Sequence, residues 1–98
     1  MTISDTRDGN RLCIAVEGRL DTNTAPELES KIREDLGGVV DLTFDLSKLE
    51  YISSAGLRVL LSAQKIMNRQ GNMVIRNCNK EILETFEITG FVDILTIE

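Results

Sequence analysis

The chain has 98 residues, of which 42% are hydrophobic, enough for the core of one small domain spanning residues 1–98. Its 11 basic and 16 acidic residues give a formal charge of −5, which argues against a nucleic-acid partner, because such proteins need a basic face to neutralise phosphates. Histidine is absent, and this excludes a phosphohistidine carrier, a Ser-His hydrolase and a His-ligated metal site. We therefore expect no enzyme activity, no catalytic residue, no metal ligand and no cofactor.

The hydropathy pattern predicts a soluble cytoplasmic protein with no membrane contact. No apolar run approaches the roughly 20 residues of a membrane helix, and no charged leader precedes an apolar run at the N-terminus. Cys13 and Cys78 fall in predicted strands among apolar neighbours. In a reducing compartment, buried free thiols are a commoner outcome for such a pair than a disulfide.

The first third of the chain predicts a hairpin followed by a loop. Residues 2–8 are expected to form a short strand that ends in a turn at Gly9-Asn10. Apolar residues then alternate through residues 12–17, which predicts a second strand ending at Gly18. Residues 19–23 are expected to be a loop, in which Asp21 is by itself a turn-former or a solvated acid.

The next segment has the marks of a helix with defined ends. Thr24 and Glu27 match a capping box, and Pro26 is tolerated in a first turn, where its missing N–H costs little. An apolar stripe follows, made of Leu28, Ile32 and Leu36. Gly37-Gly38 is expected to supply the left-handed stop.

The central stretch changes from a strand pattern to a helix pattern. Leu42, Phe44 and Leu46 alternate with polar residues, and residues 55–69 have helical spacing. Ser53 and Ser54 lie between the two patterns. Because serine is a preferred N-cap residue, the simplest interpretation of Ser54 is a structural cap.

The last third predicts a strand, a helix and a final strand. Residues 73–75 form the first of these, and Asn79 is a good N-cap for a helix that ends before Gly90 and buries Ile82, Leu83 and Phe86. Residues 91–97 are expected to return as a strand, with Ile94 and Leu95 buried. The alternation of elements predicts an α/β fold, with a mixed sheet of four to five strands and three helices packed on it.

Two segments of the centre resemble the anti-sigma-factor antagonists of the STAS domain family. They are Asp45-Leu46-Ser47 and Tyr51-Ile52-Ser53-Ser54-Ala55-Gly56-Leu57-Arg58-Val59-Leu60-Leu61. The resemblance continues in Glu17-Gly18-Arg19-Leu20-Asp21 and in Asn72-Met73-Val74-Ile75, so it covers essentially the whole chain. It implies a single STAS-like domain.

The resemblance also implies a site. In that family, a serine at the start of this helix is phosphorylated by a partner kinase, and the position two residues before the Gly-Leu pair is Ser54. Many members have an acidic residue just before this serine and a hydroxyl residue just after it. This chain has Ser53 and Ala55 there, so Ser53 is a competing acceptor. The family's matching loop contacts the partner, so the implied partner-binding residues are Asp21, Thr22, Ser53, Ala55, Gly56, Leu57 and Arg58.

The function implied by the resemblance is partner switching. The unphosphorylated chain would bind an anti-sigma serine kinase, phosphorylation of Ser54 would release it, and a serine phosphatase would reset it. The alternative is a STAS-like module that binds a partner or a ligand without phosphorylation. A serine hydrolase is disfavoured, because the chain has neither a Gly-x-Ser-x-Gly elbow nor a histidine base.

A row of polar and basic side chains follows Ser54 along the helix. Steps of four, three and four residues place Arg58, Ser62, Lys65 and Arg69 on one face. The row is either the solvated face of an amphipathic helix or part of a docking surface for an acidic patch.

Overall fold

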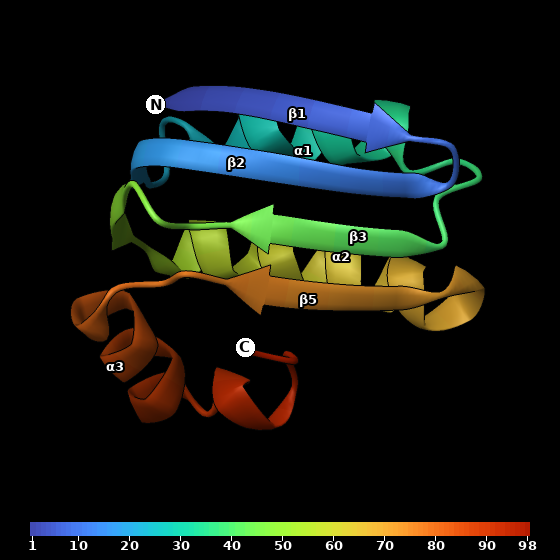
Figure 1. Ribbon diagram of the computed structural model, residues 1–98. Coiled ribbons are helices and arrows are strands. Elements are labelled where there is room, and N and C mark those ends of the chain that lie inside the picture. The colour runs from blue at the N-terminus through green and yellow to red at the C-terminus, as the bar shows by residue number, and fades with distance from the viewer.

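The computed structural model describes residues 1–98 and shows helices packed on a mixed sheet (Figure 1). The strands are β1 (Thr2–Asp8), β2 (Arg11–Leu20), β3 (Asp41–Asp45), β4 (Leu49–Ile52) and β5 (Asn72–Arg76). The helices are α1 (Ala25–Asp35), α2 (Ser54–Gln70) and α3 (Lys80–Thr89), with a short 3-10 helix at Phe91–Asp93. The predicted α/β class, with a five-stranded mixed sheet and three helices, is therefore confirmed.

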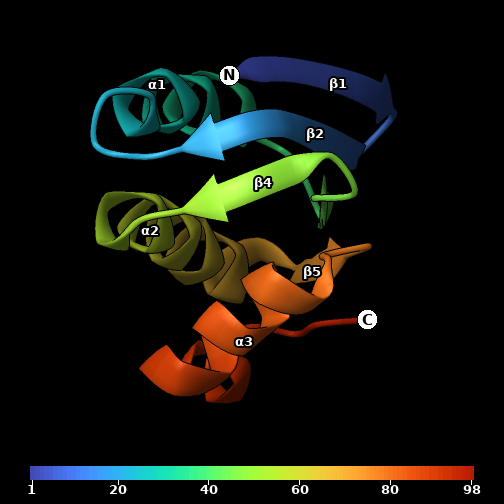
Figure 2. The same cartoon turned by 90° about the vertical axis from the view of Figure 1, so that its left-hand side faces the viewer.

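The sheet has the order β1-β2-β3-β5, and β4 pairs with the end of β2. β1 is antiparallel to β2, as the predicted hairpin requires, and the other pairs are parallel. Helices α1 and α2 cover one face of this sheet, and α3 lies beside β5 and β4 at its edge (Figures 1 and 2). None of the helices combines the length and the apolar character needed to cross a membrane.

The core lies between the sheet and the two covering helices. Every second residue of β2 and β3 is buried there, and each helix buries the stripe that faces the sheet. The fully buried members include Ile14, Phe44, Leu28, Leu60 and Met67. The side chains that pack together in the core are therefore those that recur every two residues along the strands and every three to four residues along the helices.

Gly18 does not end the second strand, contrary to prediction. The pairing register shifts between Gly18 and Arg19, where Gly18 has φ +90°, and β2 continues beyond this bulge to Leu20. The continuation pairs with β4, a strand that the sequence pattern did not reveal because it has four residues, two of them exposed. Arg19 and Leu20, predicted to lie in a loop, are thus the end of β2 and directly precede Asp21.

The predicted capping box of α1 is also wrong. Thr24 makes no side-chain cap bond; its hydroxyl donates to the carbonyl of Arg19 at 2.8 Å and accepts from the amide of Asp21 at 2.8 Å. Pro26 does lie in the first turn. At the other end the helix stops at Asp35, and Gly38, with φ +79°, is the left-handed residue of the predicted glycine pair.

The C-terminal segment is not the predicted strand. Its residues form the 3-10 helix and one isolated bridge between Ile75 and Ile97. The amide of Leu95 donates to the carbonyl of Phe91 at 2.8 Å, a helical closure that buries Leu95 but turns Ile94 outward, so that Ile94 is 48% exposed. The apolar composition of residues 91–97 predicts a strand, but the chain closes a helical turn there instead.

Three smaller expectations about burial also change. Leu83 is half-buried rather than buried on α3. Cys78 follows β5 instead of lying within a strand, and both cysteines are free and half-buried. Burial raises the pKa of both thiols.

Gly56, in the first turn of α2, allows this helix to start directly against the ends of β2 and β4. A Cβ at this position would lie 2.7 Å from Cγ of Leu20, 2.8 Å from Cγ1 of Ile52 and 3.0 Å from the carbonyl oxygen of Leu20. We expect Gly56→Ala to lower the free energy of unfolding by about 1–3 kcal/mol, because the added methyl forces the helix away from the sheet.

Urea unfolding measures this effect, and Gly37→Ala is the matched control. Gly37 is exposed, its φ is not left-handed, and a Cβ there would meet no atom within 4 Å. A Gly56→Ala protein as stable as Gly37→Ala would show that α2 does not need this close approach.

Candidate functional site

The candidate site lies where α2 begins, at the ends of β2 and β4. Ser53, and not Ser54, is the N-cap: its backbone is extended, and its Oγ accepts from the amide of Gly56 at 3.4 Å. The amide of Ser53 also donates to the carbonyl of Leu20 at 2.9 Å, which ties the helix start to β2. Ser53 is half-buried as a result.

Ser54 is the first residue of α2, so the expectation that it caps the helix is corrected. Its side chain is exposed and makes no hydrogen bond within the protein. Its hydroxyl stands at the positive end of the helix dipole, where unpaired N–H groups favour an added anion. Of the two candidate acceptors, Ser54 is thus the one with a free hydroxyl.

Asp21 forms the turn that leads from β2 into α1. Its Oδ1 accepts from the amides of Asn23 at 3.0 Å and Thr24 at 3.1 Å, and from the Thr24 hydroxyl at 3.2 Å. Its backbone carbonyl accepts from the amide of Ala25 at 2.8 Å. The interpretation of Asp21 as a turn-former is therefore confirmed, and Asp21 replaces Thr24 as the residue that organises the start of α1.

The same contacts decide the ionisation of Asp21. Partial burial acts to raise the pKa of its carboxyl, but the amides of Thr24 and Asn23, the Thr24 hydroxyl and the charge of Arg19 outweigh it. The net pKa lies below the ordinary value, so the carboxylate is the form that the turn stabilises.

Arg19 connects this turn to the strand that precedes the serines, a link that sequence reasoning missed. Its guanidinium carbon lies 4.2 Å from the centroid of the Tyr51 ring, and its Nε lies 3.8 Å from Oδ2 of Asp21. Tyr51 belongs to β4, two residues before Ser53. Only the pairing of β4 with the end of β2 brings Arg19 beside Tyr51, so no local pattern could have indicated the contact.

Several of the sequence-predicted residues line one hollow of about 360 Å³ between α1 and α2. Thr22 contributes from the Asp21 loop, and Ala55 and Arg58 contribute from α2. Gly56 and Leu57, by contrast, are buried. They position the helix and present almost no side-chain surface to a partner.

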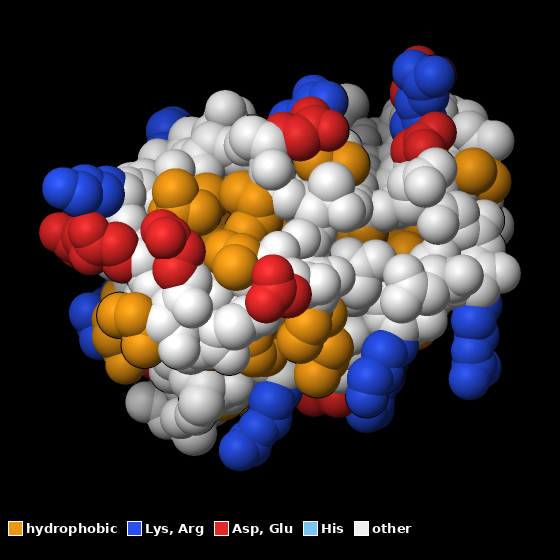
Figure 3. All heavy atoms as spheres, turned by 90° about the horizontal axis from the view of Figure 1, so that it is seen from below, with side chains coloured by type: hydrophobic (Ala, Val, Ile, Leu, Met, Phe, Trp, Pro, Cys, Tyr) orange, Lys and Arg blue, Asp and Glu red, His pale blue; other side chains and the backbone are white.

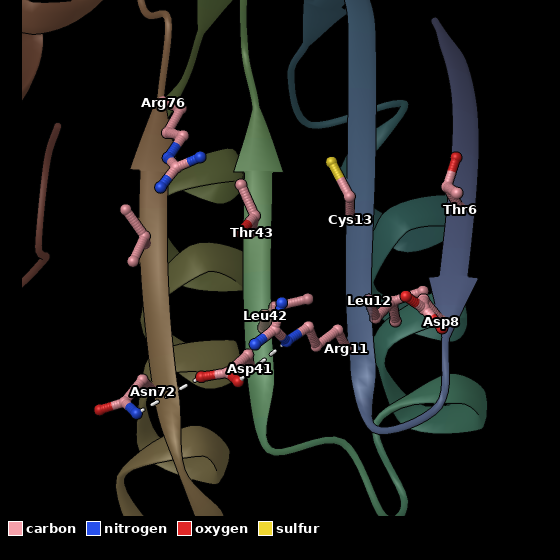
Figure 4. A pocket seen from close by; sticks show the side chains of 11 residues that line it. Thr6, Asp8, Arg11, Leu12, Cys13, Asp41, Leu42, Thr43, Asn72 and Arg76 are labelled. Carbon is pink, nitrogen blue, oxygen red and sulfur yellow. Dashed lines mark hydrogen bonds and ion pairs between the residues drawn. The ribbon is translucent and has the colours of Figure 1, made fainter.

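A second hollow, of about 460 Å³, lies on the opposite face of the sheet (Figure 4) and contains none of the predicted site residues. Three of its four charged side chains are paired, and Asp8 is not: Arg11 lies 3.7 Å from Asp41, to which Asn72 also donates at 3.5 Å. Arg76, at its other end, pairs with Glu98 at 2.9 Å. This face therefore offers few unmatched charges for a ligand.

Residues 2–98 match the STAS domain family. The chain belongs to this family. It is 34% identical over 95 residues to the anti-sigma-B factor antagonist of Listeria monocytogenes, covering 94% of this chain and 82% of that protein. The anti-sigma-B factor antagonist of Bacillus subtilis is 29% identical over 89 residues, covering 90% and 82%.

The fold is likewise that of solved STAS-type structures. An anti-sigma factor antagonist from Mycobacterium paratuberculosis superimposes with a TM-score of 0.88 at 22% identity, covering 98% of this chain and 83% of that one. The unphosphorylated form of the anti-sigma factor antagonist SpoIIAA gives a TM-score of 0.78 at 15% identity, covering 99% and 87%.

The roles of the two serines in the fold are separable by mutation. Ser53→Ala removes the cap and is expected to lower the free energy of unfolding by about 0.5–1 kcal/mol, the lower part of the usual range because the bond to Gly56 is long. Ser54→Ala should leave stability nearly unchanged, since its hydroxyl bonds to nothing. Urea unfolding of both variants measures this, and a larger loss for Ser54→Ala would contradict the assignment of the cap.

The turn at Asp21 predicts a pH-dependent contribution to stability. Because its folded pKa is below the unfolded value of about 3.9, its contribution is present above that pH and is lost as pH falls through the folded pKa. Asp21→Asn should therefore be less stable than the natural chain at neutral pH, and the two should converge in acid. Unfolding curves from pH 7 down to the acid limit test this; a difference independent of pH would show that the charge is not involved.

Proposed function

We propose that this chain is an anti-sigma factor antagonist that acts by partner switching in the cytoplasm. The unphosphorylated form binds an anti-sigma factor that is also a serine kinase, phosphorylation of Ser54 releases it, and a serine phosphatase restores it. The observation that carries the proposal is the free, exposed hydroxyl of Ser54 at the first position of α2. Ser53, the competing acceptor, is half-buried and bonded as the cap.

Relatives support the proposal. The chain shares at least 29% identity with proteins named anti-sigma-B factor antagonists. SpoIIAA, which has the same fold, is known in an unphosphorylated and a phosphorylated form. Both forms superimpose on this chain almost equally well, with TM-scores of 0.78 and 0.77.

The physical chemistry of a helix start explains how a phosphate could switch partners without changing the fold. A phosphoserine carries a charge of about −1.5 to −2 at neutral pH, and the unpaired N–H groups of the first turn of α2 accommodate it. The same charge trapped unpaired in a protein interface costs several kcal/mol. At about 1.4 kcal/mol per factor of ten, this weakens binding by roughly a hundredfold or more.

The remaining residues of the site then have distinct roles. Thr22, Ala55 and Arg58 line the hollow beside Ser54, and we assign them to partner contact. Asp21 shapes the loop that presents Thr22, and Arg19 with Tyr51 braces that loop against β4. Gly56 and Leu57 hold the start of α2 in place.

The test is phosphorylation in vitro by candidate anti-sigma serine kinases of the source organism with ATP, followed by mass spectrometry of the peptide. We expect one phosphate, on Ser54, in the natural chain and in Ser53→Ala, and none in Ser54→Ala. Ser54→Asp should stay folded but bind the kinase roughly a hundredfold more weakly, while Ser54→Ala retains binding.

Two results would contradict the proposal. Full phosphorylation of Ser54→Ala would move the switch to another residue. Tight binding of a partner that is unaffected by Ser54→Asp would instead indicate a STAS module whose interaction is independent of phosphorylation.

A further inference from the structure

The basic side chains that have no carboxylate partner are concentrated on α2. Six of the 11 basic residues form ion pairs, and Arg7 donates to three backbone carbonyls. The four that remain are Arg58, Lys65, Arg69 and Lys80. The first three are exposed on one face of α2. In a chain with a net charge of −5 and an excess of carboxylates, three neighbouring cations without a partner are unlike the rest of the surface.

These cations border a continuous groove along α2, because three neighbouring hollows share lining residues. The first two lie between α1 and α2, and the third is lined by α2 alone. The hollow beside Ala55 shares Glu29, Val59 and Ser62 with a second one of about 240 Å³. The second shares Lys65 and Ile66 with a third of about 380 Å³, which ends at Gln70. We call this continuous depression, from Ala55 to Gln70 along α2, the α1–α2 groove.

The two walls of the groove differ in charge, and its floor is apolar. On the α1 wall, Glu29 and Arg33 pair at 2.8 Å and neutralise each other. The α2 wall carries the unpaired cations. Ile32, Val59 and Ile66 lie among the apolar residues that line the groove. In the view from below, Lys and Arg side chains project separately along the lower edge of the molecule, whereas several of those at the upper and left edges lie beside Asp and Glu side chains (Figure 3).

We propose that the α1–α2 groove binds an acidic amphipathic helix of the kinase partner, which extends the interface from Ser54 to Arg69. This proposal rests on the proposed function, whose partner contacts are confined to the start of α2, near Ser54. Aliphatic side chains of the helix sit over Val59 and Ile66, and its carboxylates face Arg58, Lys65 and Arg69. An acidic segment finds net repulsion over most of this chain, so charge complementarity directs it to this groove.

The spacing of the cations defines the register of such a partner. Along α2, Arg58 and Lys65 are about 10 Å apart and Lys65 and Arg69 about 6 Å apart, at about 1.5 Å per residue. A helix lying alongside α2 meets all three cations when its carboxylates are separated by steps of seven and four residues, which fall on one helical face. Residues between them, one turn apart, supply the apolar stripe.

Charge reversal tests the electrostatic half of the proposal. The probe is the kinase that phosphorylates the natural chain, and the measurement is its association rate at two ionic strengths. Lys65→Glu and Arg69→Glu are each expected to slow association on the order of tenfold at low salt, with a smaller defect at high salt. Lys80→Glu is the matched control, because Lys80 is also exposed and unpaired but lies on α3. Equal rates for all three variants would overturn the proposal.

Blocking the groove tests its apolar half. Ser62 is exposed and lines the first two hollows, so Ser62→Phe should fill the groove and weaken kinase binding by tenfold or more without unfolding the chain. Ser30→Phe is the control, since Ser30 is exposed on α1 and lines none of the three hollows. Thermal unfolding verifies that both variants are folded. Unchanged binding by folded Ser62→Phe would overturn the proposal.

The failure of this proposal is distinguishable from the failure of the proposed function. If a kinase phosphorylates Ser54 and binds every groove variant normally, the switch stands and the groove is a solvated face. If no kinase acts on the chain, NMR titration with a synthetic helix of glutamate and leucine, compared with its lysine-for-glutamate counterpart, tests the groove alone. Shifts at Val59, Ser62 and Ile66 with the acidic peptide only support the proposal, and their absence overturns it.

Discussion

The close contact between the first turn of α2 and the end of β2 is the constraint on which the site depends. Gly56 packs against the side chain and carbonyl of Leu20, and the amide of Ser53 donates to that same carbonyl. Because α2 begins this close to a strand end, its N-cap residue is held in place by a hydrogen bond to the sheet. The side chain of Ser53 consequently has a structural role as the cap, whereas that of the next residue, Ser54, makes no hydrogen bond within the protein.

This arrangement separates the structural and the chemical tasks of two adjacent serines. The cap satisfies one of the unpaired amides of the helix, and the others remain available beside Ser54. On the other side of the same strand end, the bulge at Gly18 directs β2 into the Asp21 turn. The loop and the helix start are thus held by the last residues of one strand, which is why they present a common surface.

Charge is distributed unevenly around that surface. Most cations of this acidic chain are neutralised by nearby carboxylates, including the cation–carboxylate pair on the α1 wall of the groove. The cations of α2 are not, and exposed charges without partners contribute little to stability. The fold therefore does not require these cations on one face, which is consistent with the proposed interaction outside the chain.

The sequence by itself determined the elements whose signals are local. Burial of one face makes apolar residues recur at a regular spacing, so the alternation in β2 and β3 and the apolar stripes of α1 and α2 could be predicted. The serine-glycine motif indicated the family. The tertiary structure alone decided the features that depend on packing between distant segments. The four residues of β4 become a strand only because β2 continues past a bulge to pair with them, and this pairing places Arg19 over Tyr51.

The same distinction applies to the caps and to the C-terminus. Thr24 and Glu27 have the sequence of a capping box, but the Thr24 hydroxyl bonds to Arg19 and Asp21 at the strand end, and the amide of Glu27 donates to the backbone carbonyl of Thr24. Either serine could have capped α2, and the hydrogen bond to Leu20 selected Ser53. Residues 91–97 have a strand's composition, yet they begin with a helical turn that buries Leu95, and Phe91 and Ile97 pack against the core on either side of it. A local sequence pattern indicates which secondary structures a segment can adopt, and packing against the rest of the chain decides which of them forms.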